Sequence, residues 1–412
     1  MFRNYLLTAW KVFMRRKLFT AINLLCIVLT LVVLMVVAAL LQNTFSPTGV
    51  EAKSERFVQM VMMQSSHTEK KGRRTGLFGY KIVEKYLKPM QGVEAVSASM
   101  FPQSVAVYQD GRVSDVQLRR TDAEYWRILD FNVVSGRVIS ADDVQQGRFV
   151  AVLNQSTARR LFPGQPYLNQ KILMDGQTFT VVGVVEDALQ VNAYADAWVP
   201  FTTVASTDYK NQEFGGFTVM IMARTAADLP AVKREIVRIA KTVRYDDPTR
   251  FNLAQFWGDS KLELFARILT SSTHEDAGAP KLLASIVVLM LLFMALPALN
   301  LINLNVGRIM ERGSEIGVRK AFGATSRQLV AQLVMENVLL CLIGGAIALA
   351  SAAGVLWWLE AAGPLPYLKV ELNLAVFGYG LLITLVFGVL SGVIPAWKMS
   401  RLDPVRALKG NP

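Results

Sequence analysis

Long apolar runs alternate with polar stretches along this 412-residue chain. Each of four runs is at least about 20 residues long, which is enough to cross the roughly 30 Å hydrocarbon core of a membrane as a helix. The first run is longer than the roughly 7–15 apolar residues of a signal peptide, and no clean cleavage site follows it, so we expect a retained anchor. The runs predict transmembrane helices at 18–42, 281–306, 329–359 and 372–397.

The long segment between the first two runs, 43–280, alternates short predicted strands and helices. Asp228 precedes one predicted helix as a cap, and Pro230 lies in its first turn. This alternation predicts a folded α/β domain rather than a linker. The predicted strands cover 56–64, 93–101, 217–224 and 251–256, and the predicted helices cover 80–90 and 229–243.

The middle of that segment, 115–214, carries its own local signals. A strand at 148–153 leads to Asn154, which we expect to cap a short helix ending before Pro163. Asp175-Gly176 separates two further strands, a pattern typical of a hairpin. We therefore predict an α-helical membrane protein with four transmembrane helices and a large extracytoplasmic α/β (α+β) domain inserted between helices 1 and 2. Its membrane-proximal part would be 43–114 and 215–280, and its inserted outer subdomain 115–214.

Charge sets the expected orientation in the membrane. The net charge is +12, and 52% of the residues are hydrophobic. Basic residues gather at 1–17, 307–328 and 398–412, whereas the short loop 360–371 has few. By the positive-inside rule, both termini and the 307–328 loop are cytoplasmic, and the charge does not indicate a nucleic-acid partner. The amphipathic segment 1–17 either lies in the membrane interface or extends the first helix into the cytoplasm.

The chain offers little for catalysis or metal binding. Both cysteines, Cys26 and Cys341, fall in predicted membrane helices, so we expect no disulfide in the exported domain. His67 and His274 have no ligand-like residues at metal spacing nearby. We therefore expect no catalytic residue, no metal and no cofactor, and no enzyme activity from this chain by itself.

The loop 307–328 combines dense charge with helical signals. Gly313 and Gly317 interrupt any long helix, and Gly323 suits a C-terminal cap. Thr325 and Gln328 match a capping box that would start the next helix. The pattern indicates a short interfacial helix with an apolar corner at Phe322; the alternative is that the charges only set topology.

Several segments resemble one known family. ERGSEIGVRKAFGATSRQL, at 311–329, and GVLSGVIPAWKMSRLDPVRALKG, at 388–410, are similar to the loop and the ending of the FtsX-like, or MacB-type, permease family of ABC transporters. YWRILDFNVVSGR, VAVLNQSTARRLFP and FTVVGVVED resemble that family's periplasmic domain. The resemblance implies a bacterial inner-membrane protein with cytoplasmic termini and a large periplasmic domain.

The family resemblance also implies a coupling helix in the loop, seated on a nucleotide-binding subunit. By matching position, the residues implied to line this contact are Glu311, Glu315, Arg319, Lys320 and Phe322. MacB itself carries a nucleotide-binding domain on the same polypeptide, but this sequence has no G-x-x-x-x-G-K-[ST] motif. We therefore expect a separate ABC ATPase to bind ATP and Mg, and a second permease, identical or homologous, to complete a dimer.

The resemblance leaves three functions open. The first is export of a peptide, toxin or small compound through a periplasmic adaptor and an outer-membrane channel. The second is release of lipoproteins from the membrane. The third is FtsX-like signalling that activates a cell-wall hydrolase or senses antimicrobial peptides. In each, ATP hydrolysis would move the periplasmic domain, a mode called mechanotransmission, and membrane lipids would be a partner.

A few residues inside the predicted helices are further candidates. Glu336 is an intramembrane carboxylate, which is a functional-site hypothesis by default. It is either paired with a polar group on a neighbouring helix or extended to the cytoplasmic face. Small residues at close-packing spacing are candidates for helix or dimer contact; they are Gly344, Gly345, Gly388 and Gly392.

Overall fold

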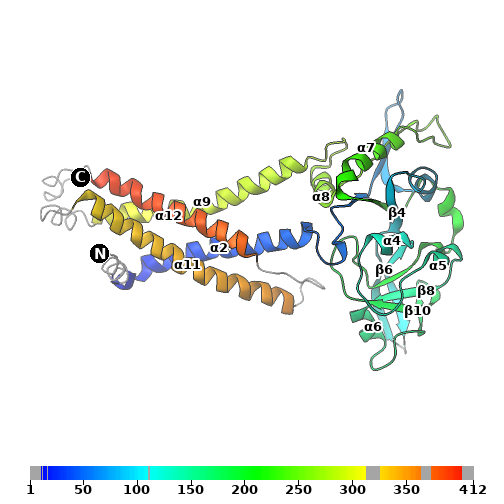
Figure 1. The fold of residues 1–412 in the computed structure, drawn as a ribbon, viewed down its shortest axis with the longest axis horizontal. Helices are drawn as coiled ribbons and strands as arrows, with labels where there is room; N and C mark the ends of the chain where they lie inside the picture. Colours follow the sequence, from blue (N-terminus) through cyan, green and yellow to red (C-terminus); the bar gives the residue numbers. More distant parts are fainter. Residues whose placement is uncertain are drawn as a thin grey trace. The chain divides into compact units, whose positions relative to one another are not determined.

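The computed structural model describes residues 11, 13–15, 17–109, 112–311, 325–362 and 373–400. The chain divides into a helical unit, 1–43 and 283–412, and an α/β domain, Thr44–Leu282. Four long helices run through the helical unit or enter it (Figure 1): α2 (Lys17–Phe45), α9 (Ala279–Glu311), α11 (Ser326–Ala362) and α12 (Leu374–Ser400).

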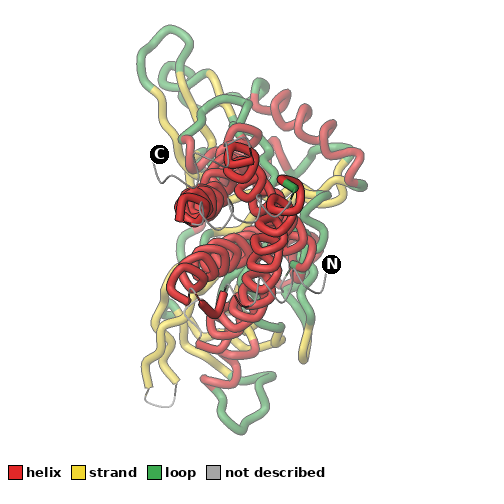
Figure 2. Tube along the Cα trace, turned by 90° about the vertical axis from the view of Figure 1, so that its left-hand side faces the viewer, coloured by secondary structure: helices red, strands yellow, loops and turns green. Residues whose placement is uncertain are grey.

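Three of these helices are long and apolar enough to cross a membrane among the described residues. Their apolar stretches are Lys17–Phe45, Ala279–Leu296 and Val330–Ala362, and α12 contributes a shorter one at Leu374–Leu390. The predicted count of four transmembrane helices and their orientation therefore stay predictions. Figure 2 looks along the long helices from their end.

Helices α2, α11 and α12 pack on one another through a buried apolar cluster that includes Ile27, Leu31 and Ala348. Asn337 on α11 adds a polar link, donating a hydrogen bond of 3.1 Å from its amide to the Gly388 carbonyl on α12. Thr325 and Gln328 form the predicted capping box in front of α11, because each side chain bonds the other residue's backbone N–H. That part of the prediction is confirmed.

The α/β domain is built on one mixed sheet of fourteen strands among its described residues. The strands are β1 (Phe57–Met60), β2 (Met63–Ser66), β3 (Arg73–Phe78), β4 (Val93–Met100), β5 (Gln103–Gln109), β6 (Arg112–Thr121), β7 (Val133–Gly136), β8 (Val150–Asn154), β9 (Lys171–Met174), β10 (Gln177–Val185), β11 (Ala197–Pro200), β12 (Phe214–Gly215), β13 (Phe217–Ala223) and β14 (Leu253–Gln255). The β8–β10 and β6–β11 pairs are parallel.

Short helices and turns connect these strands. The helices are α3 (Tyr80–Ile82), α4 (Glu124–Ile128), α5 (Ala141–Gln145), α6 (Gln155–Leu161), α7 (Leu229–Ala240) and α8 (Lys261–Thr270). The single-turn segments are η1 (Gly49–Glu51), η2 (Val83–Leu87), η3 (Phe201–Thr203), η4 (Thr207–Asn211) and η5 (Ala226–Asp228).

Six strands close into a ring in the order β11-β8-β10-β9-β5-β6, because β6 also pairs with β11. Alternate side chains of these strands point inward and fill the ring with apolar residues such as Val116, Leu153 and Phe179. The ring begins with β5, before the predicted subdomain boundary at residue 115, which falls inside β6. The division into two subdomains stays a prediction.

A second apolar core is formed by α7 and by strands β1, β2, β3, β4, β12, β13 and β14. Strand β7 pairs with β10 of the ring. Strand β13 lies between β1 and β4, with Val219 and Ile221 buried beside Ile236 of α7. The predicted single strand 56–64 is wrong. It divides into β1, which pairs with β13, and β2, which pairs with β3 and β14. A continuous apolar run cannot reveal this change of partner.

Local signals elsewhere have mixed outcomes. Asn154 caps α6 by accepting a hydrogen bond of 2.8 Å from the Thr157 N–H, as predicted. Asp175 and Gly176 both have positive φ and turn β9 into β10, so the predicted hairpin is confirmed. Asp228 occupies the N-cap position of α7 and Pro230 lies in the first turn, as predicted, but the Asp228 carboxylate accepts from the backbone and hydroxyl of Thr225 and does not cap the helix.

Candidate functional site

Helix α8 is the last element of the α/β domain before the chain enters α9. Ser260 starts it with a capping box, in which Ser260 accepts from the Glu263 N–H and Glu263 accepts from the Ser260 N–H. Such a box satisfies two of the N–H groups that a helix start leaves without partners. The helix ends at Ser271, whose left-handed conformation (φ 51°) turns the chain away.

A buried ion pair joins α8 to the segment that follows α2. The Lys261 ammonium pairs with the Glu51 carboxylate, and the Glu51 side chain is fully buried. Glu51 also accepts hydrogen bonds from the backbone and the side-chain amide of Asn192, at 3.1 and 2.8 Å. Removing one partner of a buried pair leaves the other charge uncompensated, so this contact holds the two segments in one arrangement.

A second buried pair, between Arg267 and Asp259, lies within α8 and the residues just before it, and Arg267 also reaches the segment that leads to α9. The Arg267 guanidinium donates two hydrogen bonds to the Asp259 carboxylate, at 2.6 and 2.8 Å. The same guanidinium donates to the backbone carbonyls of Ser272, His274 and Glu275. The planar fork of arginine can make all these bonds at once, so one side chain fixes the path of the chain after α8.

Burial governs the electrostatics of this pair. It raises the pKa of the Asp259 carboxyl above its ordinary value, while the Arg267 hydrogen bonds and charge oppose the rise. The Arg267 guanidinium also lies 4.6 Å from the centre of the Trp257 ring, a cation–π distance. The bidentate partner and the ring keep the arginine in place.

The last residue of α2 is in aromatic contact with α8. The ring of Phe45, the last residue of α2, meets the ring of Phe265 on α8 edge to face, with 5.6 Å between centroids. We call this set of contacts the α8 junction; its members are Phe45, Glu51, Asp259, Lys261, Phe265 and Arg267. It joins the segments through which the chain leaves α2 and enters α9.

The junction is also fixed to the domain core. The backbones of Gln59 in β1 and Asp259 exchange two hydrogen bonds, at 2.8 and 2.9 Å. Lys233 of α7 pairs with Glu263 of α8. Burial opposes ionisation of Glu263, but hydrogen bonds from Lys233 and Ser260 outweigh it and lower the pKa of this carboxyl. A displacement of α8 therefore acts directly on the sheet and on α7.

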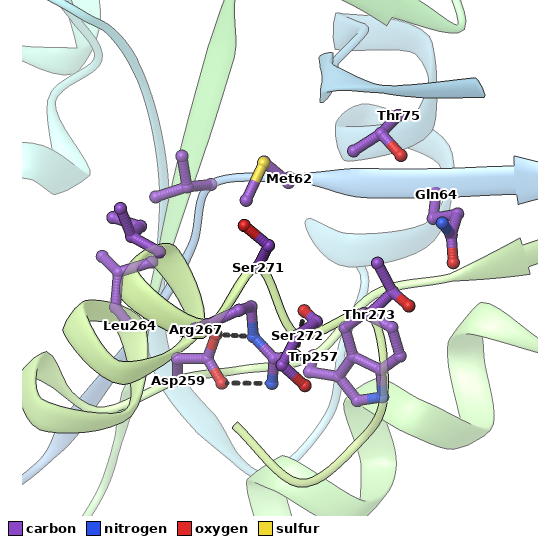
Figure 3. A pocket seen from close by; sticks show the side chains of 12 residues that line it. Met62, Gln64, Thr75, Trp257, Asp259, Leu264, Arg267, Ser271, Ser272 and Thr273 are labelled. Atoms are coloured by element: carbon purple, nitrogen blue, oxygen red, sulfur yellow. Dashed lines mark hydrogen bonds and ion pairs between the residues drawn. The ribbon is translucent and has the colours of Figure 1, made fainter. Parts of the chain in front are cut away.

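A cavity of about 380 Å³ lies beside α8 (Figure 3). Apolar side chains of Met62, Trp257, Leu264 and Ile268 line much of it. Figure 3 shows the Asp259–Arg267 pair at its wall, so a movement of α8 would change the shape of the cavity.

The structure places few of the predicted coupling residues. Glu311 is the last residue of α9. The other four, Glu315, Arg319, Lys320 and Phe322, lie outside the described residues. The coupling contact therefore stays a prediction.

Glu336 lies inside the helical unit, 1% exposed, and accepts a hydrogen bond of 3.2 Å from the Gln332 amide one turn earlier. It does not extend toward an aqueous surface. Its buried neighbour Asn337 bonds to α12. The hydrogen bond from Gln332 to the Glu336 carboxylate thus lies within α11, and the functional role of Glu336 stays a prediction.

Three of the four candidate glycines lie at close helix contacts within this chain. A Cβ at Gly344 would come 2.7 Å from Ile27 of α2, and one at Gly345 would come 2.7 Å from Leu381 of α12. A Cβ at Gly388 would come 2.8 Å from the Cys341 sulfur. Gly392 also lies on α12.

Sequence reasoning missed the α8 junction. Glu51, Asp259, Lys261 and Arg267 were not candidates, because a charged residue in a polar loop is ordinarily solvated. One signal was available: Ser260 and Glu263 match the S-x-x-E capping box, which predicts a helix start. Glu51 and Lys261 are far apart in sequence, and the eight-residue spacing of Asp259 and Arg267 matches no local pattern that predicts an ion pair.

Comparison with protein families gives two matches. The model of the MacB-like periplasmic core domain matches residues 20–239, and that of the FtsX-like permease C-terminal region matches residues 287–404. Together with the apolar helices, these matches define a membrane permease that carries a periplasmic-type α/β domain. The chain belongs to the MacB-like, FtsX-type family of ABC transporter permeases.

Two relatives illustrate the range of the family. The chain is 25% identical over 329 residues to YknZ of Bacillus subtilis (strain 168), an uncharacterized ABC transporter permease, covering 79% of this chain and 77% of that protein. It is 26% identical over 413 residues to the macrolide export ATP-binding/permease protein MacB 1 of Yersinia pestis bv. Antiqua (strain Antiqua). That match covers 99% of this chain but only 60% of the MacB protein.

Solved structures of two family domains are also similar. The periplasmic region of MacB from Actinobacillus actinomycetemcomitans matches with 14% identity and a TM-score of 0.40, covering 55% of this chain and 98% of that one. The extracellular domain of YknZ from Gram-positive bacteria matches with 17% identity and a TM-score of 0.37, covering 48% and 98%.

Proposed function

We propose that this chain is the permease subunit of an ABC transporter that converts ATP hydrolysis by a separate ATPase into movement of its extracytoplasmic domain. ATP binding would bring two ATPase subunits together below the membrane. The 307–328 loop would follow them, and α2 and α9 would carry the displacement to the α/β domain. Both termini and this loop would then be cytoplasmic.

The α8 junction is the observation that carries this proposal. One ten-residue helix holds the end of α2 through Phe45 and Glu51, and the entry to α9 through Arg267. The same helix is bonded to β1 and α7 of the core. In this proposal, these contacts would transmit a displacement as a change between two packings.

Export is the output that the relatives favour, since the Yersinia relative is described as a macrolide export protein. A peptide, toxin or small compound on the outer side of the membrane would be driven onward by the domain movement, with an adaptor and an outer-membrane channel where the cell has them. The cavity beside α8 would change shape in the same movement. The transporter would contain two permeases and two ATPases.

Copurification tests the coupling contact. A tagged full-length permease is purified from its own cells, and the associated ATPase activity is measured. Phe322→Asp, and separately deletion of residues 317–322, are expected to abolish both the copurified ATPase and the activity, because they remove the apolar corner of the loop. Val113→Asp, an exposed apolar residue of β6, is the matched control and should retain both. Full ATPase recovery with Phe322→Asp would refute the coupling role.

A further inference from the structure

Helix α8 exposes three large apolar side chains on one face, whereas its charged side chains are held in ion pairs with the domain. Phe265, Ile268 and Leu269 are 47%, 56% and 60% exposed. They recur at i, i+3 and i+4, so they share one face of the helix. A surface helix in water has the reverse arrangement, with its apolar stripe toward the core and its charges outward.

The charged residues of α8 confirm the inversion. Lys261, Glu263 and Arg267 are the charged side chains of this helix, and each forms an ion pair with the domain. Their side chains are 11%, 33% and 4% exposed. The outward face therefore carries no charge that would favour water over an apolar phase.

The position of α8 in the chain indicates what covers its exposed apolar face. Phe265 is in edge-to-face contact with Phe45, the final residue of the apolar helix α2. Only residues 271–278 separate α8 from Ala279, where the apolar helix α9 begins. The exposed face thus lies beside the last residue of one membrane-type helix and, along the chain, a short segment before the start of another.

We propose that α8 is an interfacial helix that inserts Phe265, Ile268 and Leu269 into the outer leaflet of the bilayer. The acyl chains of phospholipids, close to the headgroups, would contact this face, as they do for other helices that lie in a membrane interface. Lipid then covers the exposed face and holds the junction at a fixed depth. The inference rests on the family's membrane placement and not on ATP-driven coupling, so either can fail without the other.

Spin-label accessibility tests the insertion directly. Cys26 and Cys341 are replaced by alanine in the full-length chain, single cysteines are placed at 268 or 269, and the labelled protein is reconstituted in phosphatidylcholine nanodiscs. Arg234, exposed on α7, is the control position. We expect labels at 268 and 269 to collide preferentially with lipid-soluble oxygen, and the label at 234 with a water-soluble nickel complex.

Either of two results would overturn the proposal. Labels at 268 and 269 that behave like the label at 234 would mean that the face is in water. Labels shielded from both reagents would mean that a protein surface, such as a second permease, covers it. If the cysteine-free chain does not fold, Leu269→Trp in the native chain provides a second test. The fluorescence that the new tryptophan adds to that of the native chain should be quenched by brominated lipid. If this additional fluorescence is unchanged, insertion is refuted.

Discussion

Arg267 concentrates five hydrogen bonds on one side chain: two to Asp259 and three to the backbone carbonyls of Ser272, His274 and Glu275. With only 4% of its side chain exposed, its charge depends on Asp259 for compensation. At the residue scale, the junction is thus a set of buried charges that fix the positions of the segments they join. If one partner is removed, the other charge is left buried without compensation.

Asp259→Asn is expected to destabilise the domain by about 3–5 kcal/mol, because it leaves the buried arginine without a counter-charge. Urea unfolding of the full chain in nanodiscs, followed by tryptophan fluorescence, measures the change. Asp208→Asn is the control, since Asp208 is exposed on η4, and it should cost less than about 0.5 kcal/mol. Equal stability of the two variants would show that the pair contributes nothing.

Asp143 gives a pH-dependent prediction. Its side chain is fully buried; burial alone would raise its pKa, but hydrogen bonds from Arg137 and Ser140 lower the pKa from 3.8 to about 2. A pKa lower in the folded state means that stability is present above about 3.8 and is lost as pH falls toward about 2. Asp143→Asn should therefore lose less stability than the wild type across this window. The urea midpoints of both proteins are measured between about pH 2 and pH 4. If the two midpoints fall by the same amount, Asp143 is not the source of the pH dependence.

At the element scale, sequence predicts structure where the signal is local. The Asp175-Gly176 hairpin and the Asn154 cap are confirmed, since turn conformation and capping depend on a few adjacent residues. The break between β1 and β2 is not predictable, because it follows from strands that lie far along the chain. The capping box of Thr325 and Gln328 was likewise predicted. The ion pairs of Glu51 and Arg267 in the α8 junction were not, because no local pattern indicates them.

Helix packing in the helical unit gives a prediction with a control on the same helix. Gly344→Ala should destabilise the contact between α11 and α2 by about 1–3 kcal/mol, because the new Cβ would lie 2.7 Å from the branched methyl of Ile27. Gly354→Ala, also on α11, meets nothing within 4 Å and should be neutral or stabilising. Thermal unfolding in the same detergent compares them. Equal melting temperatures would mean that the close contact at Gly344 is not part of the native packing.

At the scale of the whole molecule, the chain joins a closed ring of strands and a second core to long apolar helices. The family matches cover residues 20–239 and 287–404, and α8 lies in the interval between them. The proposed transmission thus depends on a segment at the boundary of the two matched regions. In this proposal, the ion pairs of α8 transmit the movement driven by ATP hydrolysis to the α/β domain, and no pore is required.

Hydrogen–deuterium exchange on the full permease, purified in nanodiscs with its copurifying ATPase, tests this transmission most directly. The complex is compared without nucleotide and after trapping with ATP and vanadate. We predict that backbone protection at residues 259–275 changes between the two states, and that Phe322→Asp abolishes the change. Identical protection of these residues in both states of the intact complex would contradict the proposed transmission through α8.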